Sequence, residues 1–341
     1  MNMKTILRSL LSITASTIAL LAGQVIPAFA IDHVKIGTLF TSGGAPLYIA
    51  VQNGYFQAEG IDATLVPFDA GQPVAVATVA GSIDFGSAGF SSALYTLAAK
   101  GELRIIGGGT YDRPNFPAAG IVASNAAYAA GLKSMSQLSG HSVGLTQVGS
   151  TYNYALAVVA DKFKLDLSTI RGVPLQSFGN VASAVSGGQV DAGIVTAAGA
   201  APLLQHDKVK LLGWVGEESP WQVTLIWTTP KMANNHSSLV KRVLAAIRKG
   251  SQDAYDAFVG PGGTRKDGPT APEVIKIMQN YVKLSADQID EYMGYCDPKL
   301  RIDMHDVQRQ LNWYHAEGML KQHVTVDQIV DKRYAVALPG T

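Results

Sequence analysis

Two short loops combine glycine with hydroxyl residues in the manner of anion-binding sites. Residues 41–44 read Thr-Ser-Gly-Gly, and residues 148–151, which lie 107 positions later, read Val-Gly-Ser-Thr. Each loop precedes a predicted helix, whose first N–H groups are unpaired and carry a partial positive charge that attracts anions. Ordinary helix capping is the alternative for either loop alone. Their matching positions favour binding, and the candidate residues are Ser42, Gly43, Ser150, Thr151 and the adjacent Tyr152.

Further candidate residues follow the next predicted strands. Gln72 precedes a predicted helix, and Asn180 occupies the matching position in the second half of the chain. Their amides can hydrogen-bond a ligand or cap their own helices. Ser87, Ala88 and Thr196 follow the third strand of each half, where small residues leave room for a ligand or pack below it.

Two larger side chains complete the candidate site. Arg113 follows a predicted strand, and its guanidinium would suit a carboxylate or sulfonate through two parallel hydrogen bonds. The alternative is a solvent-facing ion pair with Asp112. Trp221 is one of several aromatic residues near these loops that would shape a pocket.

An internal repeat arranges these loops. Residues 34–37 correspond to residues 141–144, and Gly-Ser-Ile-Asp-Phe-Gly at 81–86 corresponds to Gly-Gln-Val-Asp-Ala-Gly at 188–193. The first helices are predicted over about 46–57 and 151–163, and the second strands over 63–68 and 171–176. Alternating strands and helices predict βαβ units with mainly parallel sheets, which bind ligands outside the carboxyl ends of their strands. The duplication of Asp84 and Asp191 indicates carboxylates that fix turns.

Two apolar segments, 118–123 and 222–227, are predicted to carry the chain between the two halves. The chain would enter the second half near residue 122 and return near residue 222. The segments 238–258, 271–282, 286–293 and 303–317 have the pattern of helices and carry no chemical motif. They are expected to pack on the first half as scaffold.

The first thirty residues have the features of a secretion leader. Lys4 and Arg8 precede an apolar run that is too short to span a membrane, and Ala28-Phe29-Ala30 fits cleavage after Ala30. Without this segment the chain has 25 basic and 26 acidic residues, a balance that argues against nucleic-acid binding. The lone Cys296 cannot form an internal disulfide.

Catalytic and metal-binding motifs are not found in the sequence. The chain has no HExxH, no paired CxxC, no Gly-x-Ser-x-Gly and no Gly-Lys-Ser/Thr phosphate loop, and its seven histidines are scattered. Cys296 is expected to be a packed thiol rather than a nucleophile. We therefore expect no metal, no cofactor and no enzymatic activity.

The segment IGTLFTSGGAPLYIAVQNGYFQAEGIDATLVPF, the repeated GSIDFG and GQVDAG, and the closing AEGMLKQHVTVDQIVDKRYA resemble a known family. They are similar to ABC-importer substrate-binding proteins of the sulfonate/taurine/nitrate and thiamine-pyrimidine type. The resemblance implies a two-lobed, type II-like periplasmic binding protein fold with two crossover strands. It assigns residues 31–121 and 223–341 to lobe I and residues 122–222 to lobe II.

The same resemblance implies a periplasmic receptor that closes on a small organic anion and delivers it to an ABC permease in the inner membrane. The receptor is expected to be a monomer and to bind no nucleic acid. Relatives on this fold include desulfinase-like and pyrimidine-synthesising enzymes, which remain the main alternative. Those enzymes need a reactive Cys or His in the first cleft loops, where this chain has Ser, Gly, Gln and Asn. A sensory domain acting through another chain is a further alternative.

Overall fold

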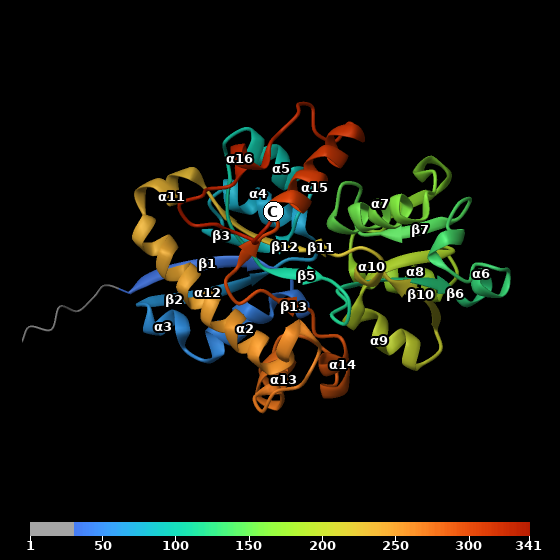
Figure 1. The fold of residues 1–341 in the computed structure, drawn as a ribbon, viewed down its shortest axis with the longest axis horizontal. Coiled ribbons are helices and arrows are strands. Elements are labelled where there is room, and N and C mark those ends of the chain that lie inside the picture. Colours follow the sequence, from blue (N-terminus) through green and yellow to red (C-terminus); the bar gives the residue numbers. More distant parts are fainter. Residues whose placement is uncertain (1–30) are drawn as a thin grey trace, which may run out of the picture. The chain divides into compact units, whose positions relative to one another are not determined.

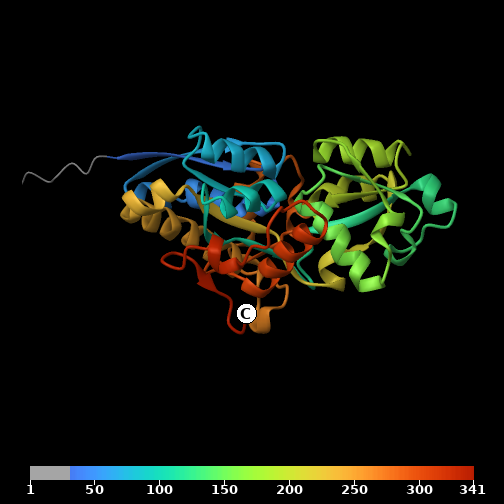
Figure 2. The same cartoon turned by 90° about the horizontal axis from the view of Figure 1, so that it is seen from above.

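The computed structural model describes residues 31–341. The expected leader and its cleavage after Ala30 lie outside these residues. The main elements form two five-stranded sheets. Figures 1 and 2 show helices flanking the sheets, and we call each sheet with its helices a lobe. Lobe I has the strand order β2-β1-β3-β12-β4, and lobe II has the order β10-β6-β9-β7-β8.

Lobe I contains most of the first copy of the repeat and one strand from later in the chain. Its strands are β1 (Asp32–Thr38), β2 (Ile61–Pro67), β3 (Phe85–Gly89), β4 (Arg104–Gly108) and β12 (Thr224–Thr228). Its helices from the repeat are η1 (Ser42–Gly44), α2 (Ala45–Gln52), α3 (Tyr55–Ala58), α4 (Gly71–Val79) and α5 (Ser92–Ala99).

Lobe II contains the second copy together with the strand that leads into it. Its strands are β6 (Ala119–Ser124), β7 (Ser142–Leu145), β8 (Arg171–Pro174), β9 (Ala192–Thr196) and β10 (Val209–Trp214). Its helices are α6 (Asn125–Ala129), η2 (Met135–Gln137), α7 (Thr151–Phe163), η3 (Leu167–Thr169), α8 (Phe178–Ser186), α9 (Ala197–Gln205) and α10 (Val215–Glu218).

The predicted repeat is confirmed down to the strand register. Gly37 pairs with Gly86 in lobe I, and Gly144 pairs with Gly193 in lobe II. In both lobes the strand from the crossing segment is antiparallel to its neighbours and lies between the third and fourth strands of the copy. The carboxyl ends of the parallel strands therefore carry equivalent loops in the two lobes.

Asp84 and Asp191 hold the strands together, as their duplication predicted. The carboxylate of Asp84 accepts the backbone N–H of Lys35 at 2.8 Å, and that of Asp191 accepts the backbone N–H of Ser142 at 2.7 Å. Each carboxylate thus joins the turn before the third strand to the first strand of its lobe.

A small third sheet forms where the chain crosses between the lobes. It consists of β11 (Trp221–Gln222), β5 (Thr110–Asp112) and β13 (Tyr295–Cys296), in that order. The chain crosses between the lobes near residues 112–118 and 221–223. The first crossing precedes the predicted segment 118–123, most of which forms β6 of lobe II, and the structure adds the C-terminal strand β13. We call the residues of β5 and β11 the hinge.

Two differences from the predicted elements have simple physical causes. The helix expected over 46–57 is broken into α2 and α3 because Gly54 adopts a left-handed conformation with φ of 70°. The C-terminal region contains two short strands, β14 (Arg301–Ile302) and β15 (Val336–Ala337), beside the expected helices. The expected helices are α12 (Ser237–Phe258), α13 (Ala271–Gln279), α14 (Ala286–Glu291) and α15 (Met304–Ala316). The structure adds α11 (Pro230–Asn235), α16 (Val326–Ile329) and the short η4 (Pro261–Gly263) between α12 and α13.

The C-terminal helices are not confined to lobe I. Helix α12 packs on α2, as expected for scaffold. In α15, however, the hydroxyl of Tyr314 lies 3.2 Å from the carbonyl oxygens of both Gly149 and Ser150 in lobe II. Within residues 31–341, no helix combines the length and apolar character needed to cross a bilayer.

Candidate functional site

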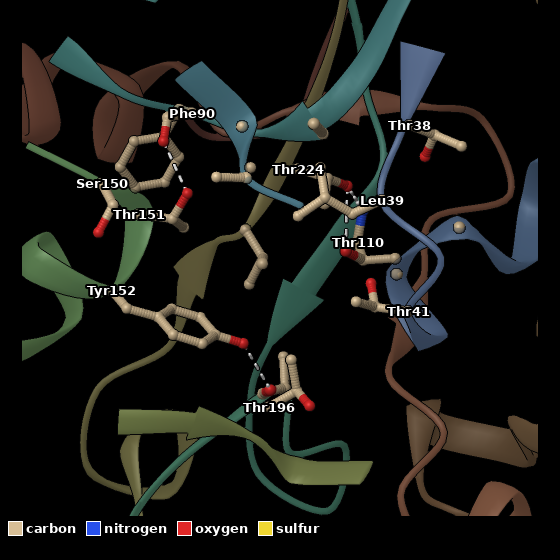
Figure 3. A pocket seen from close by; sticks show the side chains of 18 of the residues that line it. Thr38, Leu39, Thr41, Phe90, Thr110, Ser150, Thr151, Tyr152, Thr196 and Thr224 are labelled. Carbon is tan, nitrogen blue, oxygen red and sulfur yellow. Dashed lines mark hydrogen bonds between the residues drawn. The ribbon is translucent and has the colours of Figure 1, made fainter. Parts of the chain in front are cut away.

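A pocket lies between the lobes, beside the hinge. It encloses about 810 Å³, counting the part that opens to solvent. Residues from both copies of the repeat and from β5 and β12 surround it (Figure 3). The space therefore suits a small molecule.

Lobe I contributes the loop before α2 and the start of α4. The loop contains η1, whose Ser42 and Gly43 line the pocket. Helix α4 is preceded by Ala70, which provides no side-chain cap, so the N–H groups at its first turn are left for another acceptor. Gln72 in that turn also lines the pocket.

Lobe II contributes the first turns of three helices. Ser150 caps α7 by accepting the N–H of Asn153, and Thr196 caps α9 by accepting the N–H of Gly199. Tyr152 of α7 and Phe178 of α8 form an aromatic wall with their ring centroids 5.3 Å apart. The hydroxyl of Tyr152 donates to the carbonyl of Ala118 on the hinge side at 3.3 Å (Figure 3).

The pocket attracts negative charge without any charged side chain. None of its lining residues is Asp, Glu, Lys, Arg or His. Helices α4, α5, α7, α8 and α9 each bring their first residue or N-cap to it, and their N-terminal dipoles are positive there. The buried Thr38 and Thr146 make no side-chain hydrogen bond to another described residue, so their hydroxyls remain available to a ligand.

Beside the pocket, the lobes touch each other directly. The hydroxyl of Thr151 donates to the carbonyl of Phe90 at 2.6 Å, and the N–H of Ser92 donates to the carbonyl of Gly149 at 2.9 Å. The amide of Gln72 donates to the carbonyl of Val148 at 2.9 Å. These bonds join the loop before α7 to lobe I and place both halves of the site around one space.

Nine of the twelve candidate residues line this pocket, and three do not. Arg113 lies outside it with its guanidinium 4.6 Å from the ring centroid of Tyr295. Asn180 is exposed and donates to the carbonyl of Leu175 within its own loop. Trp221 is buried in the hinge and donates to Asp112. The nine that line the pocket are Ser42, Gly43, Gln72, Ser87, Ala88, Ser150, Thr151, Tyr152 and Thr196.

Sequence reasoning missed several lining residues, among which two come from the crossing strands. Thr110 of β5 and Thr224 of β12 lie at the pocket floor, where their hydroxyls are 3.0 Å apart (Figure 3). A threonine beside each predicted crossing was the available signal. Other lining residues that were not predicted are Thr38, Ser91, Thr146, Val223 and Gly294.

Neither Cys nor His is among the residues that line the pocket. Cys296 is buried, and burial raises the pKa of its thiol to about 12, so it is protonated at neutral pH. No group of three or more His, Cys, Asp or Glu side chains within residues 31–341 is arranged to hold a metal ion.

Substitution of Ser150 or Gln72 by alanine should weaken ligand binding about fivefold to tenfold each, because each loses a hydrogen bond at the site. Ser150→Ala should also cost about 1 kcal/mol of stability through the lost cap of α7. Titration calorimetry and thermal melting would measure the two effects. Ser183→Ala, at an exposed position of α8, is the control. Wild-type affinity in both variants would contradict this placement of the site.

The hinge contains a buried carboxylate that should make stability depend on pH. Asp112 accepts the N–H groups of Ala118 and Ala119 and the indole N–H of Trp221, at 2.9, 3.2 and 3.1 Å. Burial nevertheless raises its pKa from 3.8 to about 7. The folded protein therefore holds this proton more tightly than the unfolded chain, and the contribution to stability is lost as the pH rises from about 4 to 7.

Between pH 4 and pH 7, the free energy of unfolding of wild-type protein should thus fall by up to about 4 kcal/mol relative to that of Asp112→Asn. Above pH 7, the difference in unfolding free energy between the two proteins should be constant. Chemical denaturation of both proteins across this range would show it. The comparison uses the change of unfolding free energy with pH rather than its absolute value. The side-chain NH2 group of Asn faces the N–H donors around position 112, so the variant is less stable at every pH. Parallel curves would show that Asp112 titrates normally.

Proteins of known structure share this fold. The alkanesulfonate-binding protein SsuA from Xanthomonas axonopodis pv. citri, bound to MOPS, matches with a TM-score of 0.71 and 20% identity over 88% of this chain and 98% of that chain. The periplasmic nitrate-binding protein NrtA from Synechocystis PCC 6803 matches with a TM-score of 0.69 and 15% identity over 89% of this chain and 87% of that chain. The desulfurization enzyme DSZB matches with a TM-score of 0.61 and 14% identity over 89% of this chain and 97% of that chain.

These similarities establish the two-lobed periplasmic binding protein fold expected from the sequence, a fold found in receptors and in an enzyme alike. A comparison with curated protein sequences finds no match. The family described as NMT1/THI5 like matches residues 42–257, which is more than half of the chain, and the chain therefore belongs to the NMT1/THI5-like family.

Proposed function

We propose that this protein is the solute receptor of an ABC importer, which captures a small organic anion between its lobes and delivers it to a permease. The observation that carries the proposal is the pocket shared by both lobes, built from hydroxyls and helix N-termini and free of charged side chains. The receptor would act in the periplasm as a monomer after removal of residues 1–30. The division of the chain into lobes remains part of the proposal, with the first boundary moved from 121/122 to the start of β6 (Ala119–Ser124) and the second kept at 222/223.

The chemistry of the pocket supports an anionic ligand. Polarised N–H groups and free hydroxyls donate hydrogen bonds, which an oxyanion accepts in several directions. The lining contains no formal positive charge to compensate a second negative charge, so a monoanion such as a sulfonate or carboxylate fits best. The two similar receptors are named for alkanesulfonate and nitrate, which are also oxyanions.

The aromatic wall supports an organic part in the ligand. The rings of Tyr152 and Phe178 contact each other in lobe II and both line the pocket. Figure 3 shows Tyr152 across the pocket from Thr41 in the loop before α2 of lobe I. An oxyanion alone would leave these rings in contact with water. A short aliphatic or aromatic group attached to the oxyanion would cover them and contribute apolar burial.

A receptor is favoured over an enzyme on the same fold. The described lining has no Cys or His, and the one thiol of the chain is buried outside the pocket lining. A desulfinase-like or pyrimidine-synthesising reaction would need such a group at the first cleft loops. Without one, the arrangement can hold a ligand and release it unchanged.

Binding can drive closure only if the ligand contacts the closed arrangement better than the open one. Here the contacts from lobe II come from the first turn of α7 and from Thr196 of α9, while lobe I supplies η1 and α4. A ligand that spans the pocket bridges both sets. Movement of the lobes would then be concentrated at the hinge, where β5 and β11 lie next to the two crossings.

The proposal is tested by calorimetric titration of mature protein with short alkanesulfonates, aromatic carboxylates, nitrate and pyrimidines. Micromolar binding of an organic monoanion, recovered unchanged by mass spectrometry after incubation, is the expected result. Binding of nitrate or pyrimidine alone would overturn the organic-anion assignment. Chemical conversion of the ligand would establish the enzyme alternative instead.

A further inference from the structure

The pocket floor contains a pair of threonines whose roles differ, and this difference deepens the proposed function. Thr110 and Thr224 belong to β5 and β12, the strands on either side of the crossings. The hydroxyl of Thr224 accepts the backbone N–H of Thr110 at 2.7 Å and lies 3.0 Å from the hydroxyl of Thr110. Both side chains line the pocket.

The direction of each side chain separates the two roles. A Cβ placed on Gly43 would lie 3.5 Å from the methyl carbon of Thr224, 3.7 Å from Oγ1 of Thr110 and 3.6 Å from Oγ1 of Thr41. Thr224 thus turns its methyl group to the η1 loop and its hydroxyl back to β5. Thr110 turns its hydroxyl to the η1 loop, where Thr41 also presents one.

The two hydroxyls share one hydrogen bond in which either oxygen can be the donor. Oγ1 of Thr224 also accepts the backbone N–H of Thr110, and its own proton can be given to Oγ1 of Thr110. When Thr224 donates to Thr110, the proton of Thr110 must find an acceptor in the pocket. No other described side chain accepts it.

We infer that Thr110 donates the hydrogen bond that seats the ligand's oxyanion at the pocket floor, and that Thr224 is a positioning residue that orients this donor. The head of the ligand accordingly lies between Thr110 and the η1 loop of lobe I, and its organic part faces Tyr152 and Phe178 of lobe II. The inference rests on the proposed function.

The pair also links the ligand to the buried hinge network. The carbonyl of Thr224 accepts the side-chain amide of Gln222 at 3.0 Å, and the backbone N–H of Gln222 donates to Asp306 at 2.8 Å. Thr110, Thr224, Gln222 and Asp306 of α15 are thus successive partners in buried hydrogen bonds beside the second crossing. When Thr224 donates to Thr110, the proton of Thr110 is presented to an acceptor on the ligand.

A double-mutant cycle separates the two roles, with ethanesulfonate and benzoate as probes in calorimetry. Thr110→Val should weaken the better-bound probe about 10-fold to 100-fold, the range for a hydrogen bond to a charged group. Thr224→Val should cause a similar loss, and Thr224→Ser should stay within about threefold of wild type because the hydroxyl is kept. Because Thr224 acts through Thr110, the double variant should bind no more weakly than Thr110→Val.

Thermal melting of each variant provides the stability control, since Thr224→Val also leaves the N–H of Thr110 without a partner. Thr64→Val, at an exposed position of β2, is the control for the substitution itself. Additive losses in the double variant, or wild-type affinity in Thr224→Val, would overturn the inference and leave the proposed function standing. If neither probe binds wild-type protein, the organic-anion function is overturned, and this inference with it.

Discussion

Gly89→Ala should abolish tight ligand binding while leaving each lobe folded. Gly89 ends β3 at the pocket, opposite the first turn of α7. A Cβ at this position would lie 2.2 Å from Oγ1 of Thr151 and 3.2 Å from its Cβ. Ordinary contacts between such atoms are about 3.5 to 4.0 Å, so a methyl group forces the Thr151 side chain out of its position or the lobes apart at this point.

The consequences reach beyond the one clash. Oγ1 of Thr151 donates to the carbonyl of Phe90, the residue after Gly89. The backbone N–H of Ser92 donates to the carbonyl of Gly149, so this segment of lobe I is held to the loop before α7 by two hydrogen bonds. Separation of the lobes lengthens both bonds and withdraws the α7 contacts from the ligand. Loss of two or three ligand hydrogen bonds predicts about a 100-fold lower affinity.

Calorimetry with the probe that binds wild-type protein best would measure this loss, and small-angle scattering would report whether the variant stays open when ligand is added. Gly179→Ala is the matched control, because a Cβ there meets only Oγ of Ser177 at 3.9 Å and its φ is not positive. Wild-type affinity in Gly89→Ala would show that the lobe contact is not needed for binding.

Much of this architecture could be predicted because it is encoded twice. The repeat placed the loops before α2 and α7 at equivalent sheet edges, and the pairs Gly37–Gly86 and Gly144–Gly193 occupy the same register in the two sheets. Local composition then identified the loops that line the pocket. A signal that occurs in two copies is difficult to produce by chance, so fold and pocket position followed from the sequence.

Several of the residues that sequence reasoning missed or misplaced lie where no repeat exists. Thr110 and Thr224 belong to crossing strands, whose depth in the pocket depends on how the two sheets are joined. Arg113 is drawn to the ring of Tyr295 on β13, a strand that arrives from far along the chain. The contact of Tyr314 with the α7 loop is likewise set by tertiary packing. Sequence spacing carries no information on such long-range contacts.

Trp221 illustrates the same limit, since an aromatic residue near a binding edge can stabilise the hinge instead of touching ligand. It is 1% exposed, and its ring lies 5.9 Å from that of Phe90 in lobe I and 6.0 Å from that of Tyr154 in lobe II, measured between centroids. Its indole N–H donates to Asp112 at 3.1 Å. The side chain thus joins both lobes and the buried carboxylate of the hinge.

Trp221→Ala should therefore destabilise the protein by about 3 to 5 kcal/mol, because it leaves a large cavity in a buried aromatic cluster. Trp221→Phe keeps most of the packing and removes only the donor to Asp112, so it should cost about 1 to 3 kcal/mol. Denaturant unfolding would measure both values. Affinity for ligand, measured on the folded fraction, should change less than about threefold in Trp221→Phe. A large loss of affinity with unchanged stability would instead place Trp221 in contact with the ligand, as its position in the sequence first suggested.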